Sequence, residues 1–270
     1  MKYIISLLVI LGMVHSVNAE TIRIATFNAS MDGSNYVKKG QTPKGDELKV
    51  RLANGNEQQI KNIAEIIQTV RPDILLINEF DYIEDPKQGV EKFLKNYLGQ
   101  SQNGKQPIEY PHYFVAPVNT GLPTGLDLNK DGKASDVGPD AMGFGYYPGQ
   151  YGMVLLSKHP IDKAQVRTFQ KFLWKDMPGS QLPLIRDEKN QHWYDDKAKA
   201  KLRLSSKSHW DVPVNVGDKQ INVLASHPTP PVFDGPENRN GKRNFDEIRF
   251  WVDYLNGKDY FLSLIHISEP

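Results

Sequence analysis

The hydrophobic pattern near the start of the chain predicts a strand, a helix and a second strand in that order. Across residues 21–28 successive side chains sort onto two faces, which is the two-residue period of a β-strand. Residues 57–70 carry isoleucine, alanine and valine at helical spacing, and Pro72 stops this helix. An unbroken apolar run at residues 74–77 follows and indicates a strand that is buried on both faces.

A long polar segment separates the first strand from the helix. Residues 31–56 are punctuated by glycine and proline and predict a loop. Asn56 stands where the helix should begin and Gln59 follows three residues later, so the pair predicts a variant of the capping box.

The rest of the chain predicts further strands and helices around a charged middle segment. Apolar patterning indicates a short helix at 90–98, strands at 113–118 and 151–157, a hairpin of 211–216 with 219–226, and a helix at 245–255. One face of the last helix carries its apolar residues, Ile248, Trp251, Val252 and Leu255. Residues 165–206 are charged and irregular despite Trp174, Trp193 and Tyr194, and predict an excursion over the surface, with a substrate-facing wall as the alternative.

Polar residues stand where three of the apolar strands end. Asn28 closes the first strand, Asn78 and Glu79 follow the 74–77 run, and His227 follows the hairpin. Open α/β sheets bind ligands beyond such strand ends, and Asn28 and Glu79 are expected to lie close together if their strands are neighbours. A carboxylate in that position is suited to a hard cation such as Mg²⁺, which takes oxygen ligands. The alternatives are that Glu79 only caps a loop or pairs with a lysine, and that His227 is structural.

A second metal-binding motif is half matched in the middle of the chain. Oxygen-bearing side chains and a glycine stand at positions one, three, five and six of a calcium-binding loop: Asp127, Asn129, Asp131 and Gly132. Gly138 stands at position twelve, where the motif needs a bidentate glutamate, so Asp136 or Asp140 would have to replace it. The motif therefore predicts Ca²⁺ binding, with a solvated turn rich in Asp, Asn and Gly as the alternative.

The first residues predict that the protein is exported. Residues 1–19 begin with Lys2, continue with an apolar run shorter than a membrane span, and end in a small-residue pattern at Ala19. We expect a signal peptide cleaved near Ala19 and a periplasmic or secreted protein, with an N-terminal membrane anchor as the alternative. No later segment of the sequence is long and apolar enough to span a bilayer.

The overall composition bounds the size of the fold and argues against nucleic acid as a partner. A chain of 270 residues has room for one large domain or two small ones. The formal net charge is +1, and it falls to zero when Lys2 leaves with the signal peptide. Capture of nucleic acid normally needs a basic face. The chain has no cysteine, so an exported form depends on core packing or bound metal instead of disulfides.

Four stretches together carry a resemblance to a known family: residues 24–28, 72–79, 151–160 and 224–227. In this order and spacing they resemble the endonuclease/exonuclease/phosphatase superfamily, the metal-dependent hydrolases related to DNase I, exonuclease III and bacterial sphingomyelinases. The resemblance covers about residues 21–257. It implies an α/β fold of two mixed β-sheets packed face to face as a sandwich, with helices outside and the site at one end.

The resemblance also assigns roles to residues of this chain. Glu79 would be the ligand of Mg²⁺ or Mn²⁺, and Asn28 would help to hold metal and phosphate. Tyr151 takes the place of a phosphate-contacting tyrosine, and His227 that of a histidine that stabilises phosphoryl oxygens or assists proton transfer. The implied reaction is attack of water on a phosphate ester, either a diester or a monoester. The even charge balance favours a small molecule or a phospholipid headgroup over nucleic acid.

Two further segments, 205–211 and 243–249, resemble an exported bacterial branch of the same superfamily. From them we take Lys207, His209 and Arg243 as candidate substrate-binding residues.

The chain departs from the superfamily in its last part. Members finish with Gly-Asp-x-Asn and Ser-Asp-His, which supply a water-activating Asp, a phosphate-binding Asn and a further catalytic His, and neither motif follows His227. Residues 263–270 make no sense as a helix end and are expected to be a non-native tail. We therefore expect residues 20–262 to form a C-terminally truncated domain, an incomplete sandwich that is inactive although its parent is an enzyme. The alternative is a non-catalytic secreted module that binds metal or a partner on the same fold.

Overall fold

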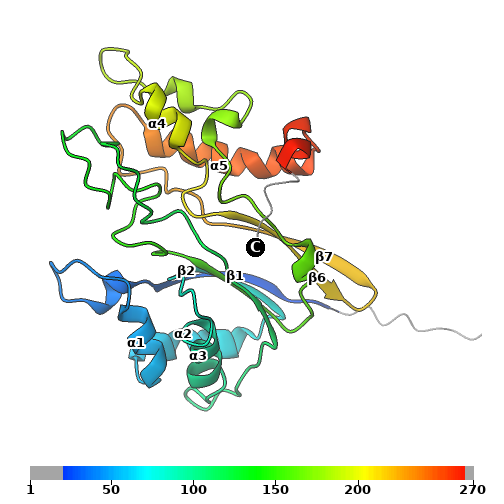
Figure 1. Cartoon of the computed structure of the whole chain (residues 1–270). Helices are drawn as coiled ribbons and strands as arrows, with labels where there is room; N and C mark the ends of the chain where they lie inside the picture. Colours follow the sequence, from blue (N-terminus) through cyan, green and yellow to red (C-terminus); the bar gives the residue numbers. More distant parts are fainter. Residues whose placement is uncertain (1–20, 265–270) are drawn as a thin grey trace, which may run out of the picture.

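The computed structural model describes residues 21–264, so the predicted signal peptide and most of the predicted tail lie outside the described residues. Figure 1 shows two β-sheets face to face in the middle of the molecule, with helices on both outer sides. The helices are α1 (Glu47–Asn54), α2 (Gln58–Val70), α3 (Val90–Phe93), α4 (Asp196–Lys201) and α5 (Arg239–Leu255). The strands are β1 (Ile24–Met31), β2 (Ile74–Phe80), β3 (His112–Phe114), β4 (Met153–Ser157), β5 (Arg167–Thr168), β6 (His209–Val216) and β7 (Lys219–Ser226). None of the described helices combines the length and the apolar character that a membrane crossing requires.

The first sheet mixes parallel and antiparallel strands, whereas the described strands of the second are antiparallel throughout. The first sheet has the order β1-β2-β4-β3, in which β1 and β2 are parallel and the other neighbours antiparallel. The second sheet has the order β5-β6-β7. The predicted α/β fold of two packed sheets with outer helices is therefore confirmed, with the difference that only the first described sheet is mixed.

Apolar side chains fill the space between the two sheets. Ile74 and Leu155 come from the first sheet, and Trp210, Val212 and Val214 come from the second. All five are fully buried. Burial of apolar surface is the main force that holds such layers together. The strand ends at the edge of the sandwich are thus fixed relative to one another.

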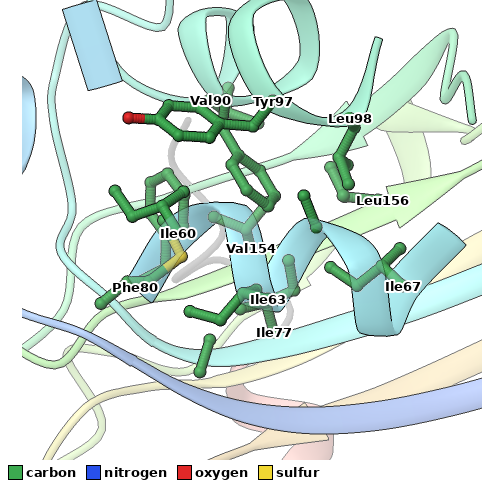
Figure 2. Packing of buried hydrophobic residues seen from close by; sticks show 14 of the residues in the cluster. Ile60, Ile63, Ile67, Ile77, Phe80, Val90, Tyr97, Leu98, Val154 and Leu156 are labelled. Carbon is green, nitrogen blue, oxygen red and sulfur yellow. The ribbon is translucent and has the colours of Figure 1, made fainter. Parts of the chain in front are cut away.

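Helix α2 covers the outer face of the first sheet because its apolar stripe matches that of the sheet. Ile60, Ile63 and Ile67 recur at helical spacing and belong to one buried cluster with Ile77 of β2 and Leu156 of β4 (Figure 2). The connection from β1 through α2 to β2 therefore joins two parallel strands that lie side by side.

The segment before α2 differs from the prediction in two respects. The N-cap residue is Glu57, not Asn56, and no side chain caps the helix. The predicted capping box is therefore wrong, because the amide of Gln59 donates instead to the carbonyl oxygens of Ala29 and Ser30, each at 3.0 Å. The long polar segment is also not irregular throughout, since it contains α1.

The charged segment 165–206 is not the surface excursion that the sequence predicted. It folds together with α5 into a third apolar cluster, in which Trp174 and Tyr194 are 1% and 9% exposed. The prediction failed because hydrophobic periodicity detects regular elements, and this segment is mostly irregular, with only short elements such as the 3-10 turns at Trp174–Asp176 and Leu182–Leu184.

Helix α5 does not bury the apolar face that the sequence indicated. Phe250 is 1% exposed and Asp246 and Glu247 are 0% exposed, whereas Ile248 and Leu255 are 52% and 73% exposed. The two buried acids accept hydrogen bonds from groups that pack against the helix, which offsets the cost of removing them from water.

Candidate active site

Glu79 and His227 meet where the two sheets face each other. Glu79 lies near the end of β2 in the first sheet, and His227 directly follows β7 in the second. The Nε2 of His227 lies 3.3 Å from the Oε1 of Glu79, and the two side chains are 20% and 24% exposed. The pair is thus shielded over most of its surface and still reachable from solvent.

Asn28 joins this pair because β1 and β2 are parallel neighbours. Their register aligns Asn28 with Asn78, the residue before Glu79, so the predicted meeting of the two strand ends is confirmed. Hydrogen bonds from His227 and Asn28 and the charge of Lys207 lower the pKa of Glu79, although burial acts in the opposite direction. Glu79 is therefore ionised at neutral pH.

Three residues at this edge adopt the left-handed backbone conformation that non-glycine residues seldom take. Ser30 has a φ of 48°, Glu79 a φ of 58° and Tyr151 a φ of 57°. The ladder between β1 and β2 also shifts its register between Asn28 and Met31. Such conformations cost about 1–3 kcal/mol each and cluster at functional sites, where the surrounding structure enforces them.

Asp81 holds the backbone at this edge, and sequence reasoning missed it. Its carboxylate accepts hydrogen bonds from the N–H groups of Gly33, at 2.8 Å, and Tyr151, at 3.0 Å, and from the hydroxyl group of Tyr147. Burial, reinforced by the nearby Asp32, raises the pKa of Asp81 to about 7. The one signal in the sequence was its position directly after the strand-end motif.

Tyr151 lies close to the same acidic groups. Burial raises the pKa of Tyr151, the carboxylates of Asp32 and Glu79 raise it further, and a hydrogen bond with Ser34 opposes them. The phenol is therefore protonated at neutral pH and able to donate a hydrogen bond.

Lys207 brings a positive charge into the interior beside Glu79. The residue is 6% exposed, and burial lowers its pKa to about 8 while the carboxylates of Glu247 and Glu79 act to raise it. A neighbouring loop presses closely on this segment, because a Cβ on Gly143 would lie 2.2 Å from the carbonyl oxygen of Ser206. Only glycine fits at that position.

His209 and Arg243 are committed to internal contacts. His209 is 1% exposed, and its Nε2 lies 2.8 Å from the carbonyl oxygen of Glu247. The guanidinium group of Arg243 donates to three carbonyl oxygens, those of Met142, Arg203 and Leu204. The structure thus gives both side chains partners within the protein, and we leave them out of the proposed substrate site.

The loop predicted to bind calcium is closed by hydrogen bonds of its own. Asp127 accepts hydrogen bonds from the N–H groups of Asp131, at 3.1 Å, and Gly132, at 2.8 Å. Asp140 is fully buried and accepts one from the N–H group of Leu128 at 2.7 Å. These carboxylates stabilise the turn, and Ca²⁺ binding by the Asp127 loop stays a prediction.

The donors at the strand ends fit a hard divalent cation. Glu79 offers a carboxylate and Asn28 an amide oxygen, and the buried Oδ1 of Asn78 has no hydrogen-bond partner within the described chain. Across residues 21–264 no three His, Cys, Asp or Glu side chains are grouped so that they could hold a metal ion. Carboxylate and amide oxygens of this kind are donors that hard divalent cations take in proteins.

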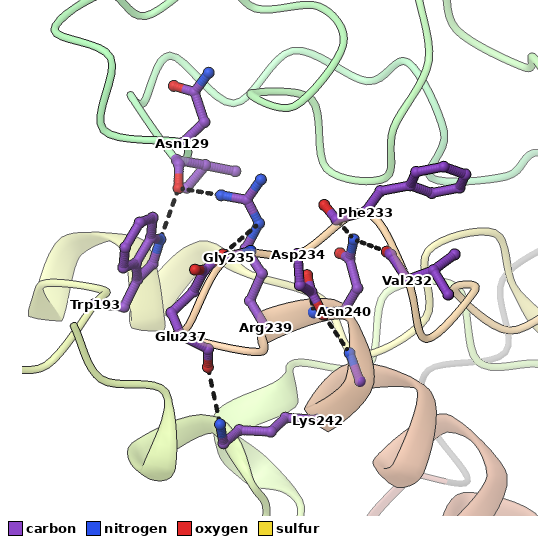
Figure 3. Close-up of polar contacts among 12 residues, drawn as sticks. Asn129, Trp193, Val232, Phe233, Asp234, Gly235, Glu237, Arg239, Asn240 and Lys242 are labelled. Carbon is purple, nitrogen blue, oxygen red and sulfur yellow. Dashed lines mark hydrogen bonds and ion pairs between the residues drawn. The ribbon is translucent and has the colours of Figure 1, made fainter. Parts of the chain in front are cut away.

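A cavity of about 640 Å³ lies beside Trp193 and Arg239, and none of its lining residues belongs to the group at the strand ends. Figure 3 shows that both side chains donate to the carbonyl oxygen of Leu128, at 2.9 Å from Trp193 and 3.2 Å from Arg239. Two of the polar groups that line the cavity are thus already satisfied within the protein. The chemistry-bearing residues are at the strand ends, and we assign the candidate site there.

The model of the Endonuclease/Exonuclease/phosphatase family matches residues 25–259 of the chain. The chain belongs to this family. The match runs from β1 through α5 and includes Asn28, Glu79 and His227. The superfamily includes phosphoesterases, and its enzymes generally depend on divalent metals. None of the curated proteins compared with the chain matches it.

Solved structures from the same superfamily resemble the chain at low sequence identity. An endonuclease/exonuclease/phosphatase from Beutenbergia cavernae is 17% identical with a TM-score of 0.40, and the alignment covers 84% of this chain and 43% of that protein. Sphingomyelinase C from Streptomyces griseocarneus is 14% identical with a TM-score of 0.39, and the alignment covers 88% and 60% of the two chains. An endonuclease/exonuclease/phosphatase family protein from Leptotrichia buccalis is 10% identical with a TM-score of 0.38, and the alignment covers 85% of this chain and 61% of that protein. The chain spans less than two thirds of the length of each of these structures.

Proposed function

We propose that the whole protein is a metal-dependent phosphoester hydrolase that acts by in-line attack of water. The observation that carries the proposal is the contact of 3.3 Å between Glu79 of one sheet and His227 of the other. Transfer of a phosphoryl group to water needs neutralisation of negative charge and a group that moves a proton. The ionised carboxylate can hold the cation that neutralises this charge, and the imidazole beside it can move the proton. Both groups lie within reach of solvent.

Glu79 would hold Mg²⁺ or Mn²⁺, with Asn28 as a second oxygen donor. When bound, the divalent cation neutralises charge that develops on the phosphoryl oxygens. The imidazole of His227, whose Nε2 lies against Glu79, would donate a hydrogen bond to a phosphoryl oxygen or move a proton.

Lys207 and Tyr151 would bind the phosphate beside these groups. The charge of Lys207 lies in a water-poor environment, where electrostatic interactions are stronger than in bulk water. The protonated phenol of Tyr151 would donate a hydrogen bond, and Asp81 keeps its backbone in place. These side chains orient the substrate and do not themselves break the ester bond.

The absence of Gly-Asp-x-Asn and Ser-Asp-His bears on whether the protein is a hydrolase or a non-catalytic module. These motifs supply, in the family pattern, the group that activates water, and neither of them follows His227 in this sequence. The same absence favours the second candidate, a secreted module that binds metal or a partner without turnover. Export with cleavage near Ala19 is part of both proposals, and Ca²⁺ on the Asp127 loop would be compatible with either.

An assay on two simple esters tests the proposed function. The reading frame is sequenced through its 3′ end, and its product is assayed with Mg²⁺ on bis-para-nitrophenyl phosphate and para-nitrophenyl phosphate. We expect one ester to be hydrolysed and the activity to disappear with EDTA. If neither ester reacts although calorimetry detects Mg²⁺ binding, the non-catalytic module is the better description.

The loop after His227 favours a lipid phosphoester among small substrates. Its residues Val232 and Phe233 are 50% and 86% exposed. The loop is nonetheless well fixed, because the side chain of Asn240 donates to the carbonyl oxygen of Val232 at 2.8 Å and its N–H group donates to Asp234 at 2.9 Å (Figure 3). Single exposed apolar side chains are common on protein surfaces, but two adjacent ones held on a fixed loop beside the site are suited to contact with an apolar partner. We therefore propose a phospholipid headgroup as the preferred substrate.

Phe233→Ser is expected to lower hydrolysis of vesicle lipid by about tenfold, because transfer of one aromatic side chain out of water contributes roughly 1.5–3 kcal/mol. Hydrolysis of the soluble nitrophenyl ester should not change. The measurement compares both rates, with vesicles of phosphatidylcholine and sphingomyelin as the lipid. Leu184→Ser, at a side chain that is 54% exposed in another segment, is the control and should change neither rate. An equal effect of Phe233→Ser on both substrates would exclude a lipid-specific role.

A further inference from the structure

Helix α5 carries two adjacent buried acids that hold different parts of the molecule. Asp246 and Glu247 are both 0% exposed. The Oδ2 of Asp246 accepts hydrogen bonds from the Nε1 of Trp174 at 2.7 Å and the N–H group of Gln181 at 2.6 Å. Asp246 therefore anchors the backbone and side chains around Trp174 and Gln181, and neither of these residues belongs to the strand-end site.

Glu247 ties together the two backbone segments that lead to the site. Its Oε1 accepts hydrogen bonds from the N–H and hydroxyl groups of Ser206, at 2.7 and 3.1 Å, and its Oε2 accepts one from the N–H group of Thr229 at 2.6 Å. Ser206 immediately precedes Lys207, and Thr229 lies two residues after His227. A single carboxylate thus fixes the backbone next to both residues.

The charge of Glu247 also acts on three buried basic groups around it. Burial lowers the pKa of Lys207, His209 and Arg243, and the carboxylate of Glu247 raises the pKa of each in opposition. The ring of His209 further contacts the main-chain carbonyl of Glu247 at 2.8 Å. Removing one partner of a buried charge pair leaves the other uncompensated, so the position of Lys207 depends on this acid electrostatically as well as through the backbone.

We infer that Glu247 is a positioning residue that holds Lys207 and His227 in place against Glu79. The inference rests on the proposed function, because these three residues define the site proposed there. Glu247 acts through the two tied segments and not by contact with substrate. A displacement of a reacting group by about 1 Å can slow an enzyme by roughly a hundredfold.

A matched pair of variants tests the inference. Glu247→Gln and Asp246→Asn each replace a fully buried carboxylate of the same helix by its amide. Both are expected to lower the thermal midpoint. Only Glu247→Gln is expected to lower kcat of the whole protein, by about tenfold or more, and to raise KM, because misplaced groups slow the chemical step and a displaced Lys207 binds phosphate less well. It should also speed amide hydrogen exchange at Ser206 and Thr229 relative to Asp246→Asn.

Equal kcat and equal exchange in the two variants would overturn the inference. The exchange measurement separates it from the proposed function. If the wild type hydrolyses neither ester, the proposed function fails and the effect of Glu247 on kcat fails with it, whereas faster exchange would still establish that Glu247 holds the two segments.

If Glu247→Gln does not fold, Ser206→Ala removes only the hydroxyl donor and is expected to lower kcat by about threefold, the effect of one hydrogen bond. An unchanged kcat in that variant would then overturn the inference.

Discussion

Glu79→Gln is expected to lower turnover of the whole protein by about a thousandfold and to weaken Mg²⁺ binding, while the fold stays intact. The substitution removes the carboxylate that hydrogen bonds from His227 and Asn28 keep ionised. A cation that neutralises transition-state charge contributes several kcal/mol, and about 4 kcal/mol corresponds to this loss of rate. Calorimetry with Mg²⁺ and single-ester kinetics measure the two effects. Because the side chain is 24% exposed and lies at a strand end, we expect little change in thermal stability.

Asp73→Asn is the matched control for this prediction, since Asp73 precedes the same strand at its opposite end. Its carboxylate accepts hydrogen bonds from the N–H group of Arg23 at 2.8 Å and from the Nζ of Lys158 at 2.9 Å. Loss of these contacts should affect stability and leave Mg²⁺ binding and turnover unchanged. Turnover that survives in Glu79→Gln would remove Glu79 from the site.

The part of the site that follows from local pattern was predictable from the sequence. A strand, a helix and a strand in succession give parallel neighbours, and buried parallel strands that end on polar residues place those residues at one edge. This reasoning brings Asn28 and Glu79 together from the sequence alone, and the register of β1 and β2 confirms it. The hairpin that carries His227 at its end follows equally from alternation and its Gly-Asp turn.

The support of the site was not predictable, because it depends on contacts between distant segments. Asp81 joins Gly33, Tyr147 and Tyr151, and no local period links an acid to partners that are far away along the chain. The left-handed conformations of Glu79 and Tyr151 are likewise imposed by tertiary structure, since neither residue type favours them.

The orientation of α5 shows why the amphipathic pattern failed for this helix. A hydrophobic stripe predicts the buried face only when buried polar groups are absent. In α5 the acids Asp246 and Glu247 lie inward because other segments donate hydrogen bonds to them, and Ile248 is left exposed. Departures from local pattern are expected near functional sites, and this one lies on the helix whose Glu247 ties the segments next to Lys207 and His227.

His227→Ala is expected to lower turnover by about a hundredfold or more, the usual contribution of a positioned proton-transfer group. Its effect on stability should be small, because the side chain is 20% exposed and its contact with Glu79 is a long 3.3 Å. The measurements are kcat on the hydrolysed ester and the thermal midpoint.

His209→Ala is the contrasting variant, since His209 lies in the sheet that leads to His227 but is only 1% exposed. The centroid of its ring lies 4.6 Å from that of Phe250 and 5.1 Å from that of Trp251. Removing this ring should cost about 2–4 kcal/mol of stability through the cavity it leaves. The two variants should therefore differ: His227→Ala should lower kcat, and His209→Ala should lower the thermal midpoint. His227→Ala could instead lower the thermal midpoint as much as His209→Ala does, with turnover falling only as far as the folded fraction falls. His227 would then be a structural residue, and the proton-transfer role must pass to another group.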